Sequence, residues 1–96
     1  MRRTPLRRKR GRETEATERR SFVAEFLPGK PCELAAVFGG CFGRMTVHER
    51  IKRSHGGAIV PGAKAEAQGQ SFHALCVGHN DWVEDHPAEA RRRGLA

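Results

Sequence analysis

The stretch Leu75-Cys76-Val77-Gly78-His79-Asn80 holds a cysteine and a histidine separated by two residues. Two side chains at this spacing belong to one tight turn and can bind one tetrahedral ion. Thiolate and imidazole ligands suit Zn²⁺, which is borderline-soft and has no redox chemistry. The pattern therefore indicates a zinc-binding turn at Cys76 and His79.

Two further cysteines lie upstream, on either side of the glycine pair Gly39-Gly40, at a looser spacing than in a standard zinc knuckle. An odd number of cysteines fits reduced, metal-binding thiols better than a secreted disulfide framework. The predicted ligands of a structural Zn²⁺ are Cys32, Cys41, Cys76 and His79. The alternatives for the fourth ligand are His48, His73 and His86. Three buried free cysteines that act as small hydrophobic residues are the competing interpretation.

The size of the chain makes a stabilising metal plausible. Of its 96 residues, 38% are apolar and 6% aromatic. A chain of this length forms one domain at most, and so small a domain buries little apolar surface. A zinc ion would add stability, because a site that is absent from the unfolded chain contributes its binding free energy to folding.

The charge points to polyanionic partners. The net charge is +7 and the isoelectric point about 10.4, a balance that favours DNA, RNA or an anionic membrane surface. A membrane is the weaker interpretation, because no apolar run approaches the roughly 18–20 residues of a spanning helix. The basic N-terminus also lacks the apolar block of a signal peptide. We therefore expect a cytoplasmic protein without a membrane partner.

Residues 1–12, MRRTPLRRKRGR, carry the most concentrated charge. Like charges this dense repel, and Pro5 and Gly11 break helices, so the segment is expected to form a disordered, flexible basic arm. Such an arm neutralises phosphates and adds salt-sensitive affinity, and a purely solubilising extension is the alternative. Residues 13–96 are expected to form the folded domain.

The domain is expected to open with a helix over residues 13–27. Apolar residues recur along one side of it from Phe22 to Leu27, which is the pattern of a helix face that packs on a core. Pro28-Gly29 ends it. The following segment, residues 32–47, is expected to form a turn between two short strands, since glycines surround its second cysteine.

The second half of the chain predicts a strand that enters His48 and another over residues 72–76. Between them, residues 56–70 are rich in Gly, Ala and Gln, which favours an exposed loop. Residues 80–93 predict a helix that Pro87 breaks or restarts. Trp82, the one tryptophan, is expected to cap the core.

Four pieces of sequence follow one another in a familiar order: Val47-His48-Glu49-Arg50, Lys52-Arg53-Ser54-His55-Gly56-Gly57, Leu75-Cys76-Val77-Gly78-His79-Asn80 and Trp82-Val83-Glu84-Asp85-His86-Pro87-Ala88-Glu89-Ala90. In order and spacing they resemble the compact HNH endonucleases of phages and prophages. The resemblance runs from Cys32 to Leu95, about two-thirds of the chain.

The resemblance implies an α+β fold: a small ββα-metal (HNH-like) domain with zinc-stapled Cys turns, preceded by an N-terminal helix. In this family a hairpin and a helix hold one catalytic divalent cation, such as Mg²⁺. His48 takes the position of the first metal ligand. Asn80 takes that of the final histidine, which some HNH-like nucleases fill with Asn. Glu84, one helical turn later, is a further oxygen ligand.

Glu49 departs from the family, since it takes the position of the histidine base. The resemblance thus makes His48, Glu49 and Asn80 the expected catalytic residues. A carboxylate is a poorer base at neutral pH than an imidazole. His48 is the alternative base, which would leave Glu49, Asn80 and Glu84 on the cation. Ser71 falls near the family's middle asparagine.

The implied activity is metal-dependent hydrolysis of phosphodiester bonds in double-stranded DNA, with nicking and an association with phage packaging proteins as family-level expectations in the host cytoplasm. Six basic side chains are expected to bind phosphates: Arg50, Lys52, Arg53, Arg91, Arg92 and Arg93. Two alternatives remain open. One is a catalytically impaired, zinc-stabilised nucleic-acid-binding module, and the other is a structural or regulatory protein whose basic arm contacts an acidic protein.

Overall fold

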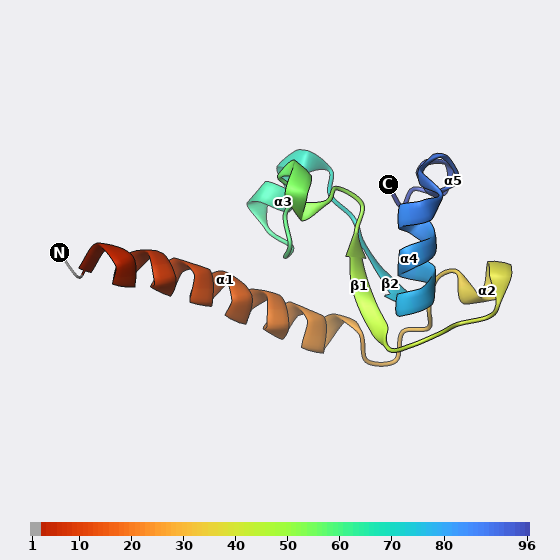
Figure 1. Cartoon of the computed structure of the whole chain (residues 1–96), viewed down its shortest axis with the longest axis horizontal. Helices are drawn as coiled ribbons and strands as arrows, with labels where there is room; N and C mark the ends of the chain where they lie inside the picture. Colours follow the sequence, from red (N-terminus) through yellow and green to blue (C-terminus); the bar gives the residue numbers. More distant parts are fainter. Residues whose placement is uncertain (1–2) are drawn as a thin grey trace.

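Two antiparallel strands and the helix that follows them form the centre of the protein in the computed structural model (Figure 1). The structure describes the backbone of residues 3–96 and the side chains of residues 14–96. Strand β1 spans Met45–Glu49, β2 spans Phe72–Cys76 and α4 spans Val77–Asp85. The other elements are α1 (Arg3–Phe26), α2 (Ala35–Phe38), the 3-10 helix η1 (Arg53–His55), α3 (Ala63–Gln68) and α5 (Pro87–Arg92). The predicted α+β class is confirmed.

The register of the two strands decides which side chains share a face of the sheet. His48 lies opposite His73, and Glu49 lies opposite Phe72. Successive side chains of a strand point to opposite faces, so the two histidines share one face while Glu49 and Phe72 share the other. Helix α4 covers the histidine face, and α1 packs on the other, where the Phe22 and Phe72 rings lie 4.8 Å apart, edge to face.

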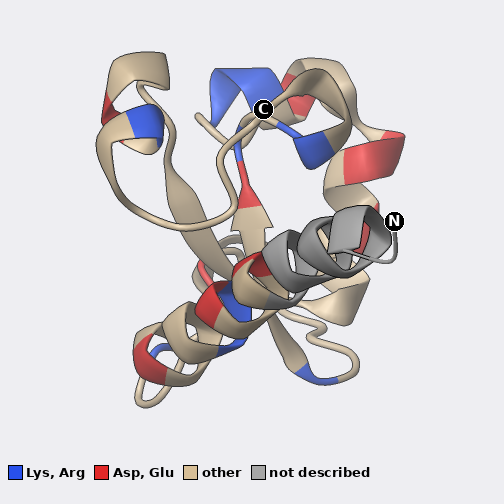
Figure 2. Ribbon diagram, turned by 90° about the vertical axis from the view of Figure 1, so that its left-hand side faces the viewer, with Lys and Arg blue, Asp and Glu red and all other residues tan. Residues whose placement is uncertain are grey.

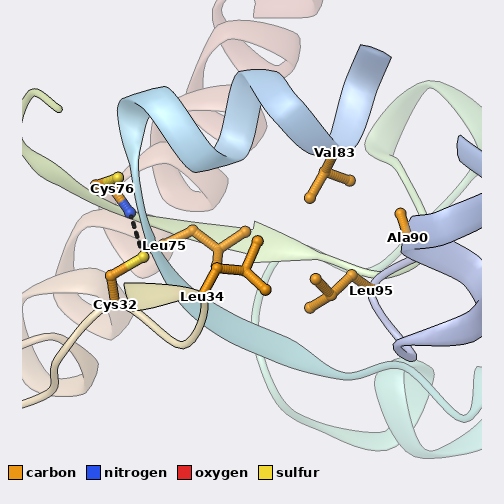
Figure 3. Close-up of a cluster of buried hydrophobic side chains, with 7 residues drawn as sticks. All are labelled: Cys32, Leu34, Leu75, Cys76, Val83, Ala90 and Leu95. Carbon is orange, nitrogen blue, oxygen red and sulfur yellow. Dashed lines mark hydrogen bonds between the residues drawn. The ribbon is translucent and has the colours of Figure 1, made fainter. Parts of the chain in front are cut away.

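The core lies between β2, α4 and the C-terminal segment (Figure 3). Leu75 and Cys76 are its largest fully buried side chains, and Trp82 packs against the cluster while half-buried, as predicted. The buried cluster consists of Cys32, Leu34, Leu75, Cys76, Val83, Ala90 and Leu95. Two of the predicted zinc ligands are therefore also core residues.

Helix α1 begins at Arg3 instead of near Glu13. Arginine, lysine and leucine favour helices, and Pro5 lies in the first turn, where its missing N–H costs no hydrogen bond. The described backbone of residues 3–12 is thus helical, not a separate disordered arm. Residues 1 and 2 and the side chains up to Glu13 lie outside the described residues, and so do the contacts predicted for the arm.

Two segments differ from the sequence prediction. Residues 35–38, expected to be extended, form helix α2, and the expected exposed loop at residues 56–70 contains helix α3. The second segment is also partly buried, because the Gln68 side-chain amide donates to the Gly56 carbonyl and its oxygen accepts from the Ala58 N–H. These contacts could not be predicted from the sequence, because the hydrogen bonds of one glutamine side chain produce no periodic pattern of apolar residues.

Among the residues that the structure describes, no helix combines the length and the apolar character that crossing a membrane requires. Helix α1, the longest, has 24 residues and is strongly charged. It extends away from the strands toward the N-terminus (Figure 1), and the molecule measures 53 × 25 × 22 Å along its principal axes.

Candidate metal centres

The four predicted zinc ligands converge on one point, with their ligand atoms all within 4.8 Å of one another. Nδ1 of His79 lies 3.2 Å from Cys32 Sγ and 3.3 Å from Cys76 Sγ. Its distance to Cys41 Sγ is 3.8 Å. A tetrahedral zinc ion with ordinary bond lengths places sulfur and nitrogen ligands about 3.5 Å apart. The cluster can therefore hold a metal ion such as zinc.

The cluster is built from four separate places in the chain. Cys32 precedes α2, Cys41 lies in the glycine-rich loop after it, Cys76 ends β2 and His79 lies in the first turn of α4. Only Cys41 is exposed, so the alternative of three buried cysteines is wrong for this residue. All three are free thiols, available to a metal.

Backbone N–H groups point at the sulfurs, as they do at thiolates that bind metal. Sγ of Cys76 accepts from the N–H of Phe42 at 3.5 Å and from that of His79 at 3.4 Å. Sγ of Cys32 accepts from the N–H of Cys76 at 3.4 Å, the contact drawn in Figure 3. Because the His79 N–H belongs to the first turn of α4, the Cys76 sulfur also caps that helix.

The thiols of Cys76 and Cys41 differ in pKa. Burial favours the neutral Cys76 thiol, but the N–H donors of Phe42 and His79 and the neighbouring sulfurs outweigh it and lower its pKa from 9.0 to about 7. Desolvation and the other two sulfurs raise the pKa of Cys41 from 9.0 to about 11. Near neutral pH Cys76 therefore loses its proton more readily than Cys41.

The alternative fourth ligands lie elsewhere. Within residues 14–96, the Cys3His cluster is the one group of three or more His, Cys, Asp or Glu side chains close enough to hold a metal ion. His86 sits at the start of α5, and its Nδ1 donates to the Trp82 carbonyl at 2.9 Å. His48 and His73 lie on the sheet face and make the contacts described below. His79 thus closes the cluster.

The structure also brings together His48 and Asn80, two of the three residues predicted to hold a second, catalytic cation. His48 is buried on β1, and Asn80 lies in α4. His48 Nδ1 and Asn80 Oδ1 are 3.2 Å apart, while His48 Nε2 lies 2.5 Å from the Leu95 carbonyl oxygen. Both nitrogens of the buried ring therefore face an oxygen atom.

The neighbouring hydrogen bonds fix the direction of this contact. Thr46 Oγ1 donates to the Leu75 carbonyl at 2.9 Å, so the hydroxyl can only accept from Asn80 Nδ2, which is 3.1 Å away. The Asn80 oxygen must then face His48. Because Nε2 of His48 donates to a carbonyl, a neutral His48 directs the Nδ1 lone pair at the lone pairs of Asn80 Oδ1. A second proton or a cation would resolve the conflict.

Glu49 is not brought to this pair. It lies on the opposite face of the sheet, where its Oε2 accepts from Arg19 Nη2 at 2.6 Å. Arg19 also donates to the carbonyls of Val47 and Ile59, at 3.1 and 2.8 Å. The side chain of Glu49 is 15% exposed. A carboxylate that is largely buried and paired with a fixed guanidinium is poorly placed to take a proton from water.

Glu84 is likewise engaged. Its Oε1 accepts from Lys52 Nζ at 2.6 Å, and both side chains are about half exposed. An ion pair this accessible contributes little and exchanges readily with other partners. Glu84 lies on the same face of α4 as Asn80, one turn further on, so the ion pair opposes the predicted ligand role only weakly.

Most of the six predicted phosphate-binding side chains have partners within the protein. Arg50 donates to the Gly69 carbonyl, Arg53 lies 3.7 Å from Glu15, and Arg92 and Arg93 both pair with Glu89. Arg92 foremost lowers the pKa of Glu89. Within residues 14–96, Arg91 is the member of the set without such a pair. Figure 2 shows basic and acidic segments interspersed over the folded part of the chain.

Sequence reasoning missed a chain of hydrogen bonds beside His48. Nδ1 of His73 lies 2.9 Å from Glu33 Oε1, and Nε2 lies 2.8 Å from Ser71 Oγ. The spacing of Ser71 and His73 by two residues on a strand gave one available signal, because such residues share a face. Nothing in the sequence indicated Glu33, which comes from a distant segment.

A cavity of about 400 Å³ lies between α1 and residues 56–64, and none of the predicted metal ligands lines it.

The sequence and the structure were also compared with known proteins. Neither the protein-family models nor the curated proteins nor the solved structures gave a match.

Proposed function

We propose that the protein is a metal-dependent endonuclease of the HNH type that hydrolyses phosphodiester bonds in DNA. One observation carries the proposal: His48 Nδ1 and Asn80 Oδ1 lie 3.2 Å apart, and both are acceptors when His48 is neutral with its proton on Nε2. Adjacent ligands of an octahedral divalent cation lie about 3.0 Å apart when the bonds are about 2.1 Å long. The pair therefore fits two neighbouring positions around one ion.

The order of the elements supports the same function. His48 lies on the first strand of the hairpin, and Asn80 lies on the helix that follows the second strand. This ββα order is the one that the sequence resemblance implies. The Cys3His cluster lies at the junction of β2 and α4, so a zinc ion there would fix the start of the helix that presents Asn80.

Each residue has a defined part in the proposed reaction. A divalent cation, when bound, polarises the phosphate and stabilises the departing 3′-oxygen. His48 and Asn80 would hold it, and the carboxylate of Glu84, which pairs with Lys52 in the structure, would be a further oxygen ligand. The Lys52 ammonium would then be available to a neighbouring phosphate. The Leu95 carbonyl keeps the His48 proton on Nε2, which leaves Nδ1 for the metal.

The charge distribution supports DNA as the substrate. Residues 1–12 hold seven Lys and Arg and no acidic residue, so they account for the whole net charge of +7. Residues 13–96 hold 11 basic and 11 acidic side chains. Affinity for a polyanion would therefore come mainly from the first turns of α1.

A second candidate is a zinc-stabilised nucleic-acid-binding module that has lost catalysis. The contact that favours it is the ion pair between Arg19 and Glu49, at 2.6 Å. This ion pair keeps Glu49, which takes the position of the family's histidine base, away from His48 and Asn80. In this case His48 would carry a second proton and donate to Asn80 Oδ1, and the pair would be structural.

Nicking of supercoiled plasmid in Mg²⁺ or Mn²⁺ separates the two candidates. For the nuclease we expect relaxed circles to accumulate, and His48→Ala to slow them at least about 100-fold. His55→Ala, which changes an exposed histidine of η1, is the matched control. Mn²⁺ binding followed by electron paramagnetic resonance should fall in Asn80→Ala. Salt-sensitive DNA binding without nicking in any metal would favour the binding module and refute the nuclease.

A further inference from the structure

We propose that His73 is the general base of this hydrolysis, a role that rests on the proposed function. The reaction needs a group that takes a proton from the attacking water. Glu49 does not meet the need, because Arg19 holds its carboxylate on the other face of the sheet. His48 does not meet it either, because its free nitrogen faces Asn80.

His73 lies beside the proposed cation ligands. It is directly opposite His48 in the β1–β2 ladder, and the two ring centroids are 6.2 Å apart. Directly opposed residues of an antiparallel pair share a face. The His73 side chain is 17% exposed, so water can reach it.

The hydrogen bonds of His73 give it the tautomer that a base requires. A carboxylate can only accept, so Nδ1, which lies 2.9 Å from Glu33 Oε1, carries the proton. Nε2 then carries no proton, and its lone pair accepts a hydrogen bond from the Ser71 hydroxyl at 2.8 Å. A base whose other nitrogen is held by a carboxylate is the arrangement found where a histidine takes a proton during catalysis.

Glu33 is itself held in place, so it can orient the ring. Its Oε2 accepts from the Ala74 N–H at 3.1 Å, and its own N–H donates to the Ala74 carbonyl at 2.9 Å. The backbone of Glu33 thus lies along β2, and its carboxylate bridges Ala74 and His73. Because the Glu33 carboxylate is fixed by the Ala74 N–H, it restricts the rotation of the His73 ring that donates to it.

In the proposed step, a water molecule takes the place of the Ser71 hydroxyl at Nε2 of His73. The water oxygen attacks phosphorus and forms the new P–O bond, while its proton passes to Nε2. The P–O3′ bond breaks, and the departing oxygen receives a proton from solvent. His73 then returns its proton to solvent, with Glu33 holding the ring throughout.

Steady-state nicking kinetics test the role. We expect His73→Gln to lower kcat at least about 100-fold, with KM and zinc content unchanged, and Glu33→Gln to lower kcat by a smaller factor. Ser71→Ala should raise kcat, because no hydroxyl then competes with water for Nε2. His55→Gln is the matched control. Normal kcat in His73→Gln, or loss of nicking in Ser71→Ala, would overturn the proposal while leaving the nuclease intact.

A wild-type protein that does not nick DNA would overturn the proposed function and, with it, the role of His73. A second measurement does not depend on activity. Long-range ¹H–¹⁵N correlation spectra should show His73 with its proton on Nδ1, and Glu33→Gln should change the proportion of the two tautomers. A proton on Nε2 in the wild-type protein would contradict the assignment, since Nε2, the nitrogen proposed to take the proton from water, would then have no free lone pair.

Discussion

Cys41 is the exposed member of the zinc cluster, and for that reason it is the best single position at which to test the metal. Replacing its sulfur by a hydroxyl removes a ligand without removing a core side chain. We expect Cys41→Ser to weaken Zn²⁺ binding at least about 100-fold, because oxygen of a neutral hydroxyl is a poor zinc ligand. Competition with a coloured chelator measures the affinity.

The matched control is Phe42→Ser, since Phe42 is the next residue and is 73% exposed. Its backbone N–H still donates to Cys76, so zinc affinity should stay close to that of the unchanged protein. Equal affinities in Cys41→Ser and the wild-type protein would show that Cys41 is not a ligand.

Zinc affinity should also depend on pH in a defined direction. The pKa of Cys76 is about 7 and that of Cys41 about 11. Between pH 7.5 and 9 Cys76 is therefore mostly thiolate, whereas Cys41 keeps its proton until the metal displaces it. At least one proton leaves per zinc bound, so the affinity should rise about tenfold or more per pH unit. Chelator competition at several pH values would reveal a flat profile if no proton were released.

At the residue scale, the sequence could predict site residues that lie close together in the chain. The two-residue spacing of Cys76 and His79 predicted a pair of metal ligands, and the structure places both in the Cys3His cluster. The other two cysteines were predicted to join them, because thiols rarely have another use in so small a domain. The engagement of Glu49 could not be predicted, since its partner Arg19 is 30 positions away in a helix that holds many other basic residues.

At the scale of elements, α1 is attached to the body by the packing of Phe22 on Phe72 and by the polar contacts of Arg19. Arg19 joins the helix to β1 and to the residue 59 carbonyl by three hydrogen bonds. We expect Arg19→Ala to lower the free energy of unfolding by about 1–3 kcal/mol, because it leaves the largely buried Glu49 carboxylate without its cation. Urea unfolding followed by the fluorescence of Trp82 measures the change.

Arg20→Ala is the natural comparison. Arg20 is exposed and its guanidinium reaches only Thr17, within the same helix. Its removal should change the stability by no more than about 0.5 kcal/mol. If both variants lost the same stability, the effect would belong to the helix itself, not to its attachment.

The sequence predicted an element correctly where its apolar residues repeat with the period of a strand or of a helix. Strand β2 begins and ends where the sequence placed it, and the Phe22–Leu27 stripe faces the body. Helix α2 was missed, because four residues between a cysteine and two glycines are too few to show a period. Helix α4 begins at Val77, three residues before Asn80, because the Cys76 sulfur takes the part of an N-terminal cap, a role for which sequence rules expect Ser, Thr, Asp or Asn.

At the scale of the whole molecule, the position of a charge should matter more than the net charge. Arg7→Gln/Arg8→Gln and Arg44→Gln/Lys64→Gln each lower the net charge from +7 to +5. We expect the first pair to weaken DNA binding more, and to reduce the slope of log affinity against log salt by about 0.9 for each phosphate that the variant no longer neutralises. Fluorescence anisotropy of a labelled duplex at several salt concentrations measures both quantities. Identical reductions in the two double variants would show that only the total charge counts.

The asymmetry of charge along α1 has a consequence for how the molecule would approach DNA, its proposed substrate. A neutral body with a positive rod projecting from it has a large permanent electric dipole along its longest axis. In the field of a polyanion such a molecule rotates before contact, and the rod arrives first. If DNA is the substrate, as proposed, the first collision would tether the protein, and a search over neighbouring positions would follow, during which the histidine face of the sheet would meet one phosphate after another.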